Sequence, residues 1–143
     1  MDNIRYALKN IVETEFKFDY DFDFSANKES NIGFLFRHKF IPEIKKNILT
    51  IEFEVKCQII GQNIVHNIIR VSFNIDPLTA VIEEKGNSMI VKAPALVETL
   101  LNVTIGAMRG IFMKNLKGTP LDMVIIPLIP MDDIKKILND KGA

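Results

Sequence analysis

The chain has 143 residues, of which 48% are apolar and 25% are charged. These proportions are typical of a folded globular domain and exclude a disordered chain. Basic and acidic side chains both number 18, so the net charge is zero, which gives no reason to expect nucleic acid or an anionic membrane as a partner. The single cysteine, Cys57, cannot form an internal disulfide and favours a reducing compartment. We therefore expect one domain over residues 1–143, cytoplasmic, with no signal peptide and no membrane insertion.

The first expected strand runs from Glu13 to Ser25, where the sequence alternates without a break. Even positions from 16 to 24 carry phenylalanine or tyrosine, and odd positions carry glutamate, lysine or aspartate. Strict period two predicts a half-buried strand, because successive side chains point to opposite faces. The preceding segment, Ile4–Val12, fits a helix or a strand equally, and both interpretations stay open.

Three further strands are expected in the first half of the chain. The first begins at Ile32 and ends before Pro42, which cannot donate to a ladder. The next, about Ile48–Ile60, leads through a Gly-Gln-Asn turn into the last, about Ile64–Ile75. The apolar face of the middle one is Leu49, Ile51, Phe53, Val55, Cys57 and Ile59. Short connections between alternating strands favour an antiparallel meander.

The second half changes period. Apolar residues from Leu96 to Phe112 recur at spacings of three to four, which predicts an amphipathic helix with Pro94 in its first turn and Gly118 as its stop. An extended apolar segment with two prolines follows, about Met123–Pro130, and a short helix, about Met131–Leu138, ends the chain. The order of elements predicts an α+β fold with a four-stranded antiparallel sheet, a long helix, a proline-containing crossover and a short C-terminal helix.

Enzymatic chemistry has little support in the sequence. His38 and His66 lack spaced cysteine or carboxylate partners, so we interpret both as structural or surface residues. Cys57 falls on an apolar strand face and is expected to be a buried hydrophobe. Asp19, Asp21 and Asp23 resemble the start of a calcium loop, but the glycine and glutamate that such a loop needs are missing, so we assign them to a solvated strand face. No catalytic residue, metal site or cofactor is expected.

Two features exceed the needs of a plain core. Eight aromatic residues lie between Phe16 and Phe40, and they either pack under the helix or serve another purpose. The helix also carries a strip of small residues, where two interior glycines each cost about 1 kcal/mol against alanine. Such a cost is offset where a backbone approaches closely, and the strip consists of Val103, Gly106, Ala107 and Gly110.

The order of elements resembles that of the SecB export chaperones. The similarity is carried by Met108-Arg109-Gly110-Ile111, Lys117-Gly118-Thr119-Pro120, Ile126-Pro127-Leu128-Ile129-Pro130 and Ile41-Pro42-Glu43-Ile44. It covers about Phe16 to Leu138 as a pattern of elements with few identities. The resemblance implies an ATP-independent holdase in protein export that buries apolar segments of unfolded proteins in a groove beneath the crossover. The residues suited to client binding are Phe36, Phe40, Leu121, Met123, Ile125, Leu128 and Met131.

The resemblance also implies a homo-oligomer, a dimer or tetramer, joined through the small-residue strip. The SecA motor is a candidate partner, although no SecA-contacting residue is assigned. The alternative is an interaction module of the same fold that binds one dedicated partner, such as a toxin or phage protein. A hot-dog enzyme also pairs a long helix with an antiparallel sheet, but its helix precedes most of its strands, and the expected order here is the reverse.

Overall fold

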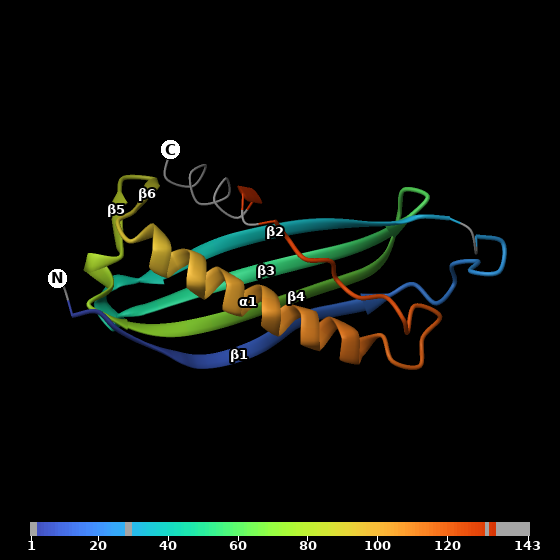
Figure 1. Cartoon of the computed structure of the whole chain (residues 1–143), viewed down its shortest axis with the longest axis horizontal. Helices are drawn as coiled ribbons and strands as arrows, with labels where there is room; N and C mark the ends of the chain where they lie inside the picture. Colours follow the sequence, from blue (N-terminus) through green and yellow to red (C-terminus); the bar gives the residue numbers. More distant parts are fainter. Residues whose placement is uncertain (1–2, 28–29, 131, 134–143) are drawn as a thin grey trace.

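The computed structural model describes residues 3–27, 30–130 and 132–133. Four long strands form one antiparallel sheet in the order β1-β4-β3-β2, and helix α1 crosses one face of it diagonally (Figure 1). We call the face under α1 the inner face and the opposite one the outer face. The elements are β1 (Arg5–Phe18), β2 (Ile32–Glu43), β3 (Ile48–Ile59), β4 (Gln62–Asp76), β5 (Ile82–Lys85), β6 (Ser88–Val91) and α1 (Pro94–Asn115).

The four long strands pair antiparallel, as expected from the sequence, but the expectation of a four-strand meander is wrong. Only β2, β3 and β4 follow one another, while β1 pairs with β4 and forms the far edge. The connection after β1 is long enough to cross the end of the sheet, so β1 can reach the free side of β4. Pro42 also does not end β2, which continues to Glu43. Because β2 is an edge strand, a residue without a backbone N–H is tolerated there.

The first strand lies earlier than the alternation indicated. β1 takes up the segment that was open between helix and strand, and it ends at Phe18 rather than Ser25. Asp19, Asp21 and Asp23 therefore lie in a loop and not on a strand face. The Asp21 N–H donates to Asp19 Oδ1 and the Ala26 N–H to Asp23 Oδ1, both at 3.0 Å. Short acidic side chains that bond to neighbouring backbone in this way stabilise turns against strands.

The core lies between the inner face and α1. All six predicted apolar residues of β3 are buried, from Leu49 to Ile59, and alternate with partly exposed polar ones. The helix begins at Pro94 as expected and extends to Asn115, and Gly118 adopts a left-handed φ of 81° just after it. The helix residues buried against the sheet are Val97, Leu100, Leu101, Thr104, Ile105, Met108 and Phe112.

A small hairpin of β5 and β6, absent from the expected elements, precedes α1. Its signal in the sequence was Gly86-Asn87, where Gly86 takes a φ of 60°. The expected short C-terminal helix lies outside the described residues apart from positions 132 and 133, which are helical.

Among the described residues, α1 is the one helix that is long and apolar enough to cross a membrane. A helix that packs in a protein core passes the same test of length and composition, and one face of α1 is buried against the sheet.

Candidate functional site

The crossover segment, Leu121–Pro130, runs without regular structure from the end of α1 back along the sheet towards β2 (Figure 1). Its inward side chains are Leu121 and Ile126, which are 6% and 2% exposed, with Val124 and Ile129 partly buried against the core. Three apolar side chains point the other way: Met123 is 90% exposed, Ile125 58% and Leu128 85%. We call Met123, Ile125 and Leu128 the crossover patch. Large apolar groups that are this exposed and this close in sequence are unusual on a monomeric surface.

Arg109 fixes the path of the crossover. Its Nε donates to the carbonyl of Ile126 and its Nη2 to the carbonyl of Pro127, both at 3.0 Å. Prolines at 127 and 130 have no N–H, so this segment cannot complete a strand ladder, and the guanidinium supplies donors from the helix instead. Because Arg109 bonds to the backbone at Ile126 and Pro127, the Ile126 side chain is held against the core. The side chains of Ile125 and Leu128 then point outward.

The start of the crossover is held by a compact turn. The Gly118 N–H donates to Asp122 Oδ2 at 3.2 Å, and Thr119 Oγ1 donates to the Leu116 carbonyl at 2.7 Å. The Leu121 N–H in turn donates to Thr119 Oγ1 at 3.2 Å. These bonds satisfy groups at the end of α1 and set the position from which the crossover patch begins.

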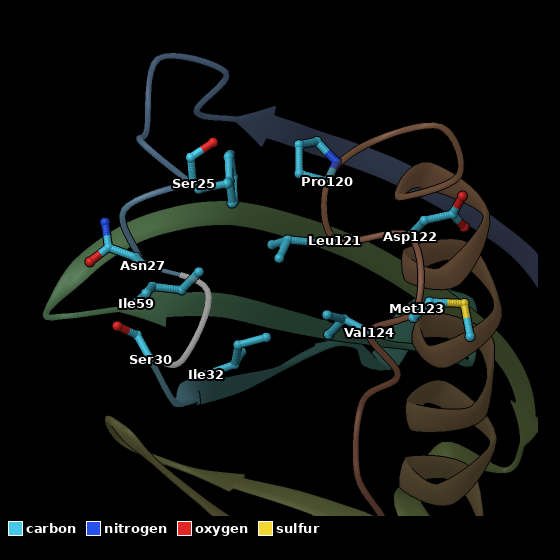
Figure 2. A pocket seen from close by; sticks show the side chains of 11 residues that line it. Ser25, Asn27, Ser30, Ile32, Ile59, Pro120, Leu121, Asp122, Met123 and Val124 are labelled. Carbon is cyan, nitrogen blue, oxygen red and sulfur yellow. The ribbon is translucent and has the colours of Figure 1, made fainter.

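A hollow of about 430 Å³ opens where the crossover leaves this turn (Figure 2). One wall is the loop after β1, the floor is the start of β2 and the end of β3, and the other wall is the crossover. Leu121 and Met123, both predicted client-binding residues, line it. Seven of the eleven lining residues are apolar, and the full lining is Phe24, Ser25, Asn27, Ser30, Ile32, Ile59, Pro120, Leu121, Asp122, Met123 and Val124.

The structure divides the predicted client-binding residues between core and surface. Phe40 is 8% exposed and belongs to the core with Leu121. Phe36 is partly buried, with its ring centroid 6.1 Å from that of Phe34 and 5.9 Å from that of Phe53. Phe40 and Leu121 are thus closed to a client, and the exposed members of the predicted set are Met123, Ile125 and Leu128. Met131 lies outside the described residues.

The small-residue strip faces away from the sheet. Val103 is 43% exposed, Gly106 and Gly110 are exposed, and Ala107 is partly buried. A Cβ placed on Gly106 or on Gly110 would meet nothing within 4 Å. The close approach that these glycines permit is therefore not used by the described part of the chain.

Sequence reasoning missed an apolar surface on β1. Tyr6, Leu8 and Ile11 lie opposite inner-face residues of β4, yet they are 54%, 52% and 42% exposed because α1 crosses the sheet diagonally and leaves this end of β1 uncovered. The signal was present in the apolar spacing of Ile4–Val12, but the choice between helix and strand was not settled. Ile32 and Ile59, which line the hollow, were assigned only to strand faces.

The titratable candidates occupy structural positions. His66 Nε2 bonds to Glu54 Oε2 at 2.5 Å on the outer face, and the His38 ring lies 5.5 Å from that of Phe40. Cys57 is fully buried as predicted, and burial raises the pKa of its thiol to about 11. Within the described ranges, no group of three histidine, cysteine, aspartate or glutamate side chains could hold a metal ion.

Comparisons with known proteins add little. No family model matches the sequence, and no curated protein matches it. A solved structure of a protein of unknown function from Streptococcus agalactiae aligns with 90% of this chain and 100% of its own, at 12% identity and a TM-score of 0.40.

Proposed function

We propose that this protein is an ATP-independent holdase of the SecB type, which keeps unfolded polypeptides from aggregating by covering their apolar segments. The observation that carries the proposal is the crossover patch, where Met123, Ile125 and Leu128 are 90%, 58% and 85% exposed beside the 430 Å³ hollow. A methionine in such a surface adapts to many partner shapes.

The energy of such binding comes from apolar area. Burying one exposed Met, Ile or Leu side chain contributes roughly 2 kcal/mol, so the patch supplies roughly 6 kcal/mol before the cost of ordering a flexible client. One protomer then gives weak binding. Tight retention of a client requires several patches on one particle, which makes oligomerisation part of the proposal.

The proposed homo-oligomer is a dimer or tetramer. Two surfaces support it: the small-residue strip on α1, whose glycines have open space above them, and the uncovered inner face of β1 at Tyr6, Leu8 and Ile11. An apolar strand at a sheet edge is an aggregation liability unless something covers it. A second copy of the chain would cover both surfaces by symmetric contacts.

The test is protection of several unrelated, chemically unfolded proteins from aggregation, measured by light scattering without nucleotide. The wild-type chain should protect all of them, and Met123→Asp combined with Leu128→Asp should abolish protection while thermal unfolding stays unchanged, because both side chains are exposed. A matched control places aspartate at two other exposed apolar sites, Leu35 (52%) and Ile60 (64%), and should protect like wild type.

The outcomes separate the candidate functions. Protection lost equally in both double variants would show that any added surface charge abolishes binding, and that the crossover patch has no special role. Absence of protection by the wild-type chain for every client would reject the holdase and favour a module that binds one dedicated partner.

A further inference from the structure

The outer face of the sheet carries cross-strand rows of charged residues, and most of them alternate in sign. In one row, Glu52 of β3 stands between Lys39 of β2 and Arg70 of β4, with Arg70 Nε 2.9 Å from Glu52 Oε1. In the next row, Glu54 stands opposite Arg37, at 3.8 Å from its Nε. Opposite charges that face each other across strands stabilise a sheet.

One row departs from this rule. Lys56 of β3 pairs with His66 of β4, and His66 pairs with Lys17 of β1, so two lysines flank an imidazole with no carboxylate in the row. His66 itself bonds to Glu54, so neither lysine has a carboxylate opposite it in the row. Lys56 has no ion pair among the described residues, and Lys17 reaches only Glu15, at 3.4 Å, with its own side chain 75% exposed. Such an exposed pair contributes little and exchanges readily.

The same residues line a second hollow, of about 370 Å³, on the outer face. A β-bulge lies at its floor: Cys57 pairs with Val65 and Gln58 with Asn63, which leaves Ile64 unpaired. Bulges of this kind re-aim side chains and are frequent beside functional sites. The full lining is Lys17, Phe18, Asp19, Lys56, Asn63, Ile64, Val65 and His66.

Asn63 adds a neutral donor. Its Oδ1 accepts a hydrogen bond from Gln58 Nε2 at 2.6 Å, so the amide group is oriented with Nδ2 available for a ligand. Three donors of two kinds, two ammonium groups and one amide, therefore line the same hollow.

Asp19 is the one acidic residue that lines the hollow. Its Oδ1 accepts the Asp21 N–H at 3.0 Å, which orients this oxygen toward its own loop. Glu54 accepts from His66 and lies near Arg37. Glu15 is the carboxylate that an incoming anion must displace from Lys17.

We propose that this hollow binds an oxyanion of the phosphate class, inorganic phosphate or a phosphate monoester, through Lys17 Nζ, Lys56 Nζ and Asn63 Nδ2. A phosphate group carries up to two negative charges and several acceptor oxygens at neutral pH, which matches two ammonium groups and an amide donor. The site is on the opposite face of the sheet from the crossover patch, so its test is independent of the holdase proposal.

The experiment is a titration of the isotope-labelled full chain with inorganic phosphate, followed by amide chemical shifts at constant ionic strength set with sodium chloride. We expect saturable shifts around Lys17, Lys56 and Asn63, with a dissociation constant on the order of 1 mM. Lys56→Gln and Lys17→Gln should each weaken binding about tenfold. Lys39→Gln, which removes an equal charge four residue pairs away in a row that contains Glu52, should leave it unchanged. Phosphoserine in place of phosphate distinguishes a monoester ligand from the free ion.

Shifts that grow linearly with phosphate, or that chloride produces equally, would mean screening alone and overturn the site. Equal binding by Lys56→Gln and Lys39→Gln would overturn it as well. The amide shifts of inner-face residues report whether each variant is folded. If one lysine variant unfolds, the phosphate affinity of the other lysine variant tests the site.

Discussion

Replacing Asn67 with alanine should remove the polar link that joins β1, β4 and the end of α1. Asn67 is fully buried, and its side chain makes three hydrogen bonds. Nδ2 donates to Glu13 Oε2 and to the Glu15 carbonyl, both at 2.8 Å, and Oδ1 accepts from Asn115 Nδ2 at 3.1 Å. Asn115 Nδ2 also reaches Glu13 Oε2, at 2.6 Å.

The size of the effect follows from these bonds. A neutral hydrogen bond contributes about 1 kcal/mol net, and one to a charged group about 2 kcal/mol. The loss of two neutral bonds and one to a carboxylate gives about 4 kcal/mol. A domain of this size is stable by about 5–15 kcal/mol, so the thermal midpoint should fall by roughly 10 °C.

The measurement is urea unfolding followed by circular dichroism, with Asn74→Ala as the matched control. Asn74 is on the same strand and exposed, so its replacement should change the free energy of unfolding by less than about 0.5 kcal/mol. If Asn67→Ala costs less than about 1 kcal/mol, the buried network does not hold β1 to the helix, and the reasoning is refuted.

Three further predictions concern assembly, the cysteine and metal. Gly110→Ala should raise monomer stability by about 1 kcal/mol, since nothing lies within 4 Å of the added Cβ. Gly110→Leu should dissociate the proposed oligomer in light scattering, and an unchanged particle mass would exclude the strip as the interface. With its pKa at about 11, the Cys57 thiol is roughly one thousandth ionised at pH 8, so a thiol reagent should label it only in denaturant, and rapid labelling of the folded chain would contradict its burial. Dialysis against a chelator should leave the thermal midpoint unchanged, and a fall that added metal restores would reveal a metal requirement.

The sequence predicted the central elements better than the edges. In β3 and α1 a single period governs burial, because each turns one face to the core along its length, and Leu49 to Ile59 alternate without error. β1 is different, because its pairing register with β4 shifts near Lys9 and Thr14. Period two therefore fails across Thr14: Glu13 stands opposite Ile69 on the inner face, where it meets Asn67. A bulge arises from how two strands pair, so the sequence of one strand alone does not reveal it.

The crossover shows the same limit at the candidate site. Its inward positions, 121, 124, 126 and 129, are spaced three, two and three residues apart, a pattern that belongs to neither strand nor helix. Hydropathy alone could not separate Leu121 from Met123, or Ile126 from Leu128, because all four are apolar. Ile126 is separated from Leu128 by the bond from Arg109 to the Ile126 carbonyl, a contact across 17 positions of the chain, and Leu121 from Met123 by the turn after α1. If the crossover patch binds clients as proposed, Arg109→Met, which keeps the apolar stem and removes both bonds, should let the crossover turn and reduce client protection without any change in the crossover patch itself.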